Sequence, residues 1–287
     1  MEFFITAIIL GLCLSAMGLG IFMSMKIFNI PDITTDGSYT LGAVVTAILL
    51  MQNISLIIII PIVLISGAVA GCITAFIHTK FKIDALLAGI LTMTALYSIN
   101  LIFLSRSNQP LIGTQNIFNS INLFSNQVYN QFIFVFVIII IITLLLSYLL
   151  KTDFGIAMRA TGNNSKMVRA MGINDDRMKI FGLAIANALT AFSGFLVAQY
   201  QAFADINMGI GIVITGLGSV LIADALQKLF KLHSVIWQLI FVILSSIIFQ
   251  SVLAITLSIG INPNLLKLVT ASFVLFIVGI TRFRKTA

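Results

Sequence analysis

Hydrophobic residues form long uninterrupted stretches along this chain, and polar residues collect in short intervals between them. A helix rises 1.5 Å per residue, so about 20 apolar residues span a hydrocarbon core roughly 30 Å thick. The stretches lack the alternation of apolar and polar residues that is typical of outer-membrane barrels. The pattern therefore predicts an all-α polytopic membrane protein with about 8–10 transmembrane helices. The best estimate is nine, from hydrophobic segments at about 3–25, 39–52, 54–78, 83–104, 131–150, 179–203, 209–227, 235–260 and 267–281.

Composition and charge support this class and orient it. The chain is 60% hydrophobic and 9% charged, whereas soluble domains are about one quarter charged. The net charge of +7 indicates topology rather than nucleic-acid binding, because cytoplasmic loops are enriched in Lys and Arg. If all nine segments cross, every one of the 16 Lys and Arg residues except Arg106 and Lys267 lies on one face. That face is predicted to be cytoplasmic, with the N-terminus outside, the C-terminus inside, and no nucleic acid as partner.

Two segments, 39–52 and 209–227, are short and Gly-rich, so we expect broken or re-entrant helices there. Irregular backbone at membrane depth requires protein or a watery cavity to satisfy its amides. The polar outer loop 105–130 is interpreted as a lid, a docking surface for an external partner, or a plain solvated loop.

A sequence similarity suggests internal symmetry. GLCLSAMG leads to Gly37, and GLAIANAL leads to Gly209 at nearly the same spacing, with an odd number of predicted crossings between the two units. This predicts inverted repeats within a single transmembrane domain, repeat one at about 1–150 and repeat two at about 179–287, joined by a cytoplasmic loop at about 151–178. Close packing of helices through small residues would produce the same local similarity.

Five polar or small residues stand at the starts of the two short segments. Asp36 or Ser38 can cap the free amides of the helix that follows them. Alternatively, each helix start directs its positive dipole end toward a polar or anionic group of a substrate. The second possibility predicts a translocation pathway at Asp36, Gly37, Ser38, Asn207 and Gly209.

Sequence motifs of enzymes are missing. The chain contains no G-x-x-x-x-G-K-[ST] loop, no H-E-x-x-H pair and no G-x-S-x-G elbow. We expect no catalytic residue, no cofactor and no metal. A carboxylate deep in a predicted span, as a proton-coupled carrier needs, is also missing, which disfavours an ion-coupled secondary transporter; that class remains the alternative.

The central loop has helical organisation. TGNN carries helix start signals, SKMVRAM continues for about two turns, and Gly172 predicts the stop. Lys166 and Arg169 lie on the polar flank of this short helix, opposite its apolar side. Such a helix suits either an anionic lipid surface or a groove on a partner protein.

The stretch FGIAMRATGNNSKMVRAMGINDDRMKIFGLAIANALTAFSGFLVAQ resembles the cytoplasmic loop and following helix of permease subunits of bacterial ABC importers, in the branched-chain amino acid and ribose permease superfamily. The matching positions are Gly155, Arg159-Ala160, Gly162-Asn163, Ala170, Gly172-Ile173, Lys179 and the small-residue run 184–194. IPDITTDGSYTLGA is similar to a subgroup of permeases proposed to import tryptophan or tyrosine.

This resemblance implies a permease of the bacterial inner membrane that moves a small organic solute by alternating access. The solute it implies is an aromatic or hydrophobic amino acid, with a nucleoside or a sugar as the alternative. It further implies separate ATPase subunits on the cytoplasmic face, an extracellular or periplasmic substrate-binding protein, and a second permease copy in a homodimer. The ATPase would engage a coupling helix and its surroundings at Arg159, Gly162, Asn163, Ser165, Arg169, Ala170 and Gly172.

Overall fold

The computed structural model describes residues 2–119, 126–232, 234–262 and 265–286. Each of the nine predicted hydrophobic segments corresponds to a helix within these ranges: α1 (Glu2–Ile21), α2 (Thr34–Met51), α3 (Leu56–Lys80), α4 (Ala85–Leu104), α5 (Gln127–Lys151), α8 (Asp175–Gln201), α9 (Ile212–Phe230), α10 (Val235–Ser258) and α11 (Leu266–Thr286). The remaining elements are shorter: the π-helix η1 (Phe22–Ile27), the 3-10 helix η2 (Ile117–Asn119), the strands β1 (Asn108–Pro110) and β2 (Phe203–Asp205), and the loop helices α6 (Asp153–Asn163) and α7 (Ser165–Ala170).

Seven helices of the described chain are long and apolar enough to cross a membrane: α1 with η1, α3, α4, α5, α8, α9 and α10. The chain is thus a polytopic helical membrane protein, as predicted, whereas the count of nine crossings remains a prediction. The apolar part of α11 is shorter, at Leu266–Ile277. The first turns of α2 are polar, and 14 of its 18 residues are buried. Because protein rather than lipid surrounds α2, that helix does not need an apolar surface.

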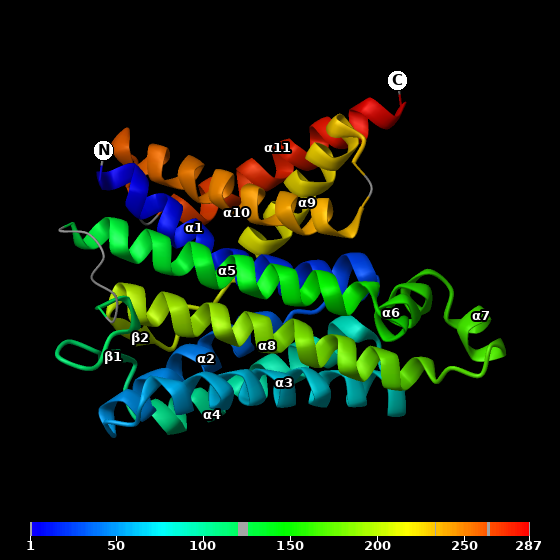
Figure 1. The fold of residues 1–287 in the computed structure, drawn as a ribbon, viewed down its shortest axis with the longest axis horizontal. Helices are drawn as coiled ribbons and strands as arrows, with labels where there is room; N and C mark the ends of the chain where they lie inside the picture. Colours follow the sequence, from blue (N-terminus) through cyan, green and yellow to red (C-terminus); the bar gives the residue numbers. More distant parts are fainter. Residues whose placement is uncertain (1, 120–125, 233, 263–264, 287) are drawn as a thin grey trace.

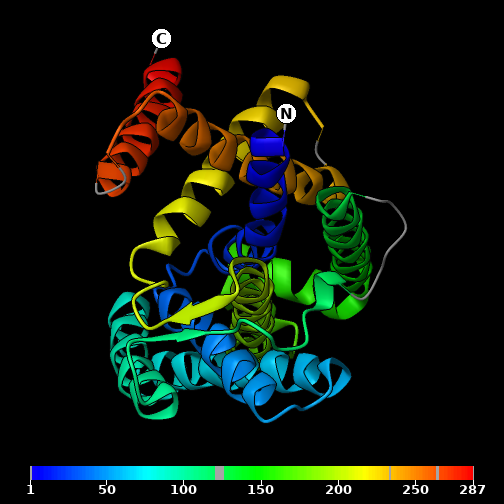
Figure 2. The same ribbon diagram turned by 90° about the vertical axis from the view of Figure 1, so that its left-hand side faces the viewer.

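Helix α8 lies at the centre of the bundle, with α1 on one side and α2 and α3 on the other (Figure 1; Figure 2). Small residues permit this close packing. Gly20 lies against the carbonyl of Ala186, Gly42 against the backbone of Ala191, and a Cβ at either glycine would collide with α8. These two glycines therefore have a packing role, and the predicted inverted repeat stays a prediction.

The two ends of the bundle differ. Helices α6 and α7 project from one end of the bundle, and α11 runs toward the same end (Figure 1). Helix α1 begins at the opposite end, where β1 and β2 also lie. The N-terminal and C-terminal helices thus start and finish at opposite ends of the bundle; which of these ends faces the cytoplasm stays a prediction. The strands β1 and β2 pair antiparallel, with Asn108 opposite Asp205 and Pro110 opposite Phe203. Part of the predicted outer loop therefore forms a small ribbon; residues 120–125 of that loop lie outside the described residues.

The structure corrects where the two predicted interruptions lie. Helices α2 and α9 are each continuous, and irregular backbone precedes each of them. Before α2, the chain leaves α1 through the π-helix η1 and the connection 28–33; before α9, it turns through 206–211. The start of α2 is buried inside protein and the start of α9 is partly buried, and protein groups must satisfy the free amides of irregular backbone at membrane depth.

Candidate functional site

Asp36 joins the starts of α2 and α9. Its carboxylate accepts hydrogen bonds from the backbone N–H groups of Gly211 and Val213, both at 2.8 Å. It is 6% exposed. The N-cap residue of its own helix, Ile33, makes no side-chain capping bond. The prediction that Asp36 caps the helix following it is therefore wrong: the carboxylate caps α9, whose first amides would otherwise lack acceptors.

Three of the five predicted pathway residues meet around a small cavity. Asp36, Gly37 and Gly209 line a space of ≈ 20 Å³ together with Tyr97 and Asn100 of α4, about the room one water needs. The amide of Asn100 donates to the carbonyl of Gly37 at 3.4 Å. Its buried Oδ1 has no hydrogen-bond partner in the part of the chain that the structure describes. A residue that lines this mostly apolar cavity thus carries a buried polar atom without a partner.

The fourth residue, Ser38, belongs to a buried network that also contains Asp32 and Asn187. Ser38 Oγ donates to Asn187 Oδ1 at 2.7 Å, and Asn187 Nδ2 donates to Asp32 Oδ2 at 2.7 Å. Asp32 Oδ1 in turn accepts from the backbone N–H of Thr34 at 2.9 Å. These bonds fix the start of α2 to the middle of α8, so Ser38 has a structural partner rather than a place on the small cavity.

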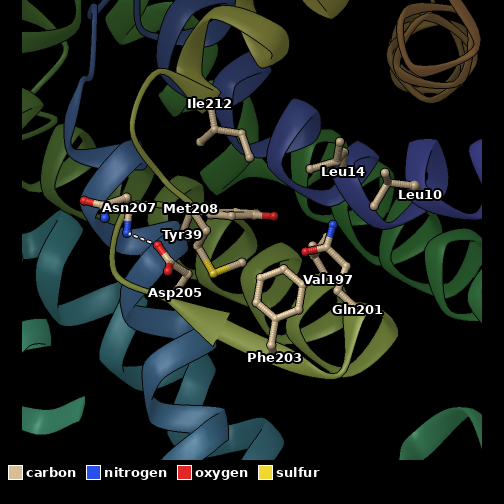
Figure 3. Close-up of a pocket in the computed structure, with 10 residues that line it drawn as sticks. All are labelled: Leu10, Leu14, Tyr39, Val197, Gln201, Phe203, Asp205, Asn207, Met208 and Ile212. Atoms are coloured by element: carbon tan, nitrogen blue, oxygen red, sulfur yellow. Dashed lines mark hydrogen bonds between the residues drawn. The ribbon is translucent and has the colours of Figure 1, made fainter. Parts of the chain in front are cut away.

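The fifth residue, Asn207, lines a larger pocket of ≈ 380 Å³ beside β2, at the end of the bundle opposite α6 and α7 (Figure 1; Figure 3). Its backbone N–H donates to Asp205 Oδ1 at 2.7 Å. The turn 206–211 separates this pocket from the small cavity, because its residues line both. The lining residues are Leu10 and Leu14 of α1, Tyr39 of α2, Val197 and Gln201 of α8, Phe203 and Asp205 of β2, Asn207 and Met208 of the turn, and Ile212 of α9.

The predicted helix of the cytoplasmic loop exists as α7, and local caps define it. Asn164 accepts from the backbone N–H of Met167 at 3.1 Å. Gly172 adopts the left-handed conformation with φ of 83° two residues after the last residue of α7, a conformation that glycine tolerates at a helix end. The Asn-capped, Gly-terminated helix that the sequence predicted is confirmed.

An ion pair ties α7 to the first turn of α8. Arg169 donates to both oxygens of Asp175, through Nε to Oδ1 and through Nη2 to Oδ2 at 2.8 Å. Lys179 adds a bond to Asp175 Oδ2 at 3.2 Å. The hydrogen bonds to the Asp175 carboxylate raise the pKa of Arg169 above its usual value, so its guanidinium stays charged. The sequence placed Arg169 on a solvated flank and missed this partner.

Some of the other predicted coupling residues are packed against the bundle, and the rest are exposed. Gly162 packs against the carbonyl of Ile27, and its own carbonyl accepts from Asn29 at 3.0 Å. Arg159 is half-buried, and its Nε has no partner among the described residues. Ser165 is half-buried, whereas the predicted residues Asn163, Ala170 and Gly172 are exposed.

The apolar side of α7 is mostly uncovered. Met167 is 59% exposed and Met171 67% exposed, while Val168 is buried.

Among the described residues, no group of three or more His, Cys, Asp or Glu side chains could hold a metal ion.

Comparisons with known proteins identify the family to which this chain belongs. A family profile described as "Branched-chain amino acid transport system / permease component" matches residues 3–279. The chain belongs to this family of ABC importer permeases. The permease is 39% identical over 261 residues to the tyrosine transport system permease protein of Clostridioides difficile (strain R20291), covering 91% of this chain and 85% of the relative.

A second relative and a solved structure show more distant similarity. A probable branched-chain amino acid transport permease protein, LivH of Methanocaldococcus jannaschii, is 30% identical over 207 residues, 68% of this chain and 65% of its own length. The solved structure of PsaBC from Streptococcus pneumoniae in complex with Fab aligns with a TM-score of 0.52 at 16% identity, covering 96% of this chain and 89% of the other. That structural similarity concerns the fold alone.

Sequence reasoning missed most of the larger pocket. Tyr39, Gln201, Phe203, Asp205 and Met208 come from separate segments, and no local pattern joins them. One signal was present: FADIN places an acid two residues before Asn207, a residue that was already predicted to line the pathway.

Proposed function

We propose that this permease forms the membrane channel of an ATP-driven importer for an aromatic or hydrophobic amino acid. Family membership and the similarity to a tyrosine permease support an amino acid as the solute. The observation that carries the ATP-driven mechanism is the cytoplasmic extension of α6 and α7, which projects beyond the ends of the long helices (Figure 1). ATP hydrolysis takes place in separate ATPase subunits.

The exposed side of α7 is the docking surface for such a subunit. Met167 and Met171 present exposed apolar side chains, whereas Lys166 lies on the polar flank of the same helix, outside this surface. Adaptable methionines suit a groove on a protein partner. A push on α7 reaches the membrane through the Arg169–Asp175 pair, because Asp175 is the first residue of α8 and α8 contacts α1, α2 and α3 at the bundle centre. We assign α7 as the coupling helix on this basis.

A second permease copy faces α4. Tyr97 is 44% exposed and Ser98 is exposed in the middle of that helix, and neither side chain bonds to a residue within the described ranges. Unpaired hydroxyl groups are costly in hydrocarbon, so this side of α4 meets protein or water rather than lipid. Tyr97 also lines the small cavity beside Asp36, Gly37 and Gly209. The translocation pathway therefore runs between two copies along α4, with these three residues behind it.

An external binding protein delivers the solute to the opposite end of the bundle, where β1 and β2 form the ribbon. The larger pocket, which we call the outer pocket, opens beside β2. Solute released at this end therefore enters the outer pocket next to the turn 206–211. Alternating access then requires this turn and the start of α9 to move relative to α2.

The coupling assignment is tested by capturing the importer's ATPase subunit on purified permease. Arg169→Glu places a negative charge opposite Asp175 and is expected to reduce ATPase capture at least tenfold. Lys166→Glu is the matched control, since Lys166 is an exposed cation of the same helix without an ion pair among the described residues. It should retain most of the capture. Equal capture by both variants and the native protein contradicts the assignment of α7.

A further inference from the structure

The outer pocket has two polar ends and an apolar middle. Asp205 and Asn207 lie on one side of the pocket in Figure 3, and the Tyr39 hydroxyl points away from them, into the space lined by Leu14 and Val197. The volume of ≈ 380 Å³ is in the range of pockets that hold small organic molecules.

Tyr39 brings an unsatisfied donor to this pocket. The residue is 2% exposed, and its hydroxyl makes no hydrogen bond to any residue in the described part of the chain. The hydroxyl oxygen faces the pocket space (Figure 3), and the hydroxyl of a buried tyrosine usually has a partner. A polar group of a bound molecule, or a water that such a molecule displaces, would satisfy it.

The end of the pocket at Asp205 and Asn207 distinguishes ligand groups by their charge. Asp205 places a carboxylate at the pocket, and none of the ten described lining residues is basic. The backbone amides at the start of α9 do not offset this negative charge, because Asp36 already accepts from Gly211 and Val213. This end therefore favours an ammonium group over a buried carboxylate.

Apolar and aromatic side chains separate the two ends. Phe203 and Met208 line the middle of the pocket (Figure 3). Phenylalanine rings and methionine sulfur both make favourable contacts with an aromatic ring. A ligand that matches the whole pocket has an ammonium group, an aromatic ring and a polar substituent at the far side of that ring.

We infer that this pocket binds an aromatic amino acid with a ring hydroxyl, such as tyrosine, with its ammonium group at Asp205 and its ring hydroxyl at Tyr39. The α-carboxylate then faces the open mouth of the pocket. This inference rests on the proposed function, since it names the solute and its orientation within the importer. Tyr39 acts as the specificity-determining residue, because a site that hydrogen-bonds a hydroxyl discriminates strongly against the analogue without it.

The test is direct binding of radiolabelled tyrosine and phenylalanine to the purified permease–ATPase complex without binding protein. Native protein is expected to bind tyrosine more tightly than phenylalanine. Tyr39→Phe should weaken tyrosine binding about tenfold, the loss of roughly one hydrogen bond, and leave phenylalanine binding unchanged. Asp205→Asn should weaken the binding of both amino acids. Tyr129→Phe, at an exposed tyrosine of α5 outside the pocket, is the control and should change neither.

Two outcomes overturn the inference: native protein that does not prefer tyrosine, or a Tyr39→Phe variant that weakens both amino acids equally or neither. An unchanged thermal unfolding midpoint for Tyr39→Phe excludes misfolding as the cause of a loss. Failure of the proposed function looks different, because ATP would then drive no amino-acid uptake into proteoliposomes even with native Tyr39. ATP-driven uptake without an altered tyrosine-to-phenylalanine ratio in Tyr39→Phe removes the inference alone.

Discussion

Removal of the Asp36 carboxylate should destabilise the permease more than the loss of an ordinary helix cap. In Asp36→Ala, the N–H groups of Gly211 and Val213 lose their acceptors, both of which are 2.8 Å away. Loss of a cap costs about 0.5–2 kcal/mol, and a buried donor left unsatisfied costs about 1–3 kcal/mol, an upper range for these two partly buried N–H groups. Because the two contributions overlap, we expect a combined loss of about 2–4 kcal/mol. Asp36→Asn keeps one acceptor oxygen and should lose about half as much.

The assay is thermal unfolding of the purified protein in detergent, followed by the fraction that remains monodisperse after heating. Asp84→Ala is the matched control, because Asp84 is an exposed N-cap that accepts from Leu86 within its own helix at 2.9 Å. That variant should lose about 0.5–1 kcal/mol. The predicted order of midpoints is native, Asp84→Ala, Asp36→Asn and then Asp36→Ala. If Asp36→Ala unfolds at the same temperature as Asp84→Ala, the bond between α2 and α9 does not stabilise the fold and the reasoning fails.

Two further predictions concern the packing and charge of the bundle. Gly42→Ala should lower the unfolding midpoint measurably, because the added Cβ would collide with the backbone of Ala191. Gly279→Ala, with open space around it, is the control and should not lower the midpoint. Equal effects of the two substitutions would contradict the close approach of α2 and α8. The ion pair between Lys26 and Asp224, at 2.7 Å, is partly exposed and should contribute less than about 1 kcal/mol. Lys26→Asp should therefore lower stability slightly, and adding Asp224→Lys should restore it in the same heating assay; no restoration would show that the pair is not coupled.

The sequence predicted what local patterns determine. Hydrophobic length located the long helices, because a membrane-spanning helix satisfies its own backbone and shows its apolar surface directly in the sequence. The Asn164 cap and the Gly172 stop of α7 were also predictable, since each acts within a few residues of itself. The orientation that the positive charges indicate, with α6 and α7 in the cytoplasm, stays a prediction.

Contacts between distant segments could not be read in the same way. Asp36 stands next to a helix start that it could cap, yet it caps a helix 175 residues away. Asp224 has Lys228 one turn further along, yet it pairs with Lys26. The strands β1 and β2 are three residues each, too short for an alternating pattern. In each case the packing of the helices determines which distant segment is the partner, and the local sequence does not show this.

Uptake by the reconstituted importer tests the central claim most directly. Proteoliposomes that contain the permease and its ATPase subunits, supplied with the binding protein and labelled tyrosine outside, should accumulate tyrosine only when ATP is available to the ATPase subunits. The Arg169→Glu variant should abolish accumulation and Lys166→Glu should preserve it. Accumulation driven by an imposed proton or sodium gradient without any ATPase subunit would contradict the account and identify a secondary transporter.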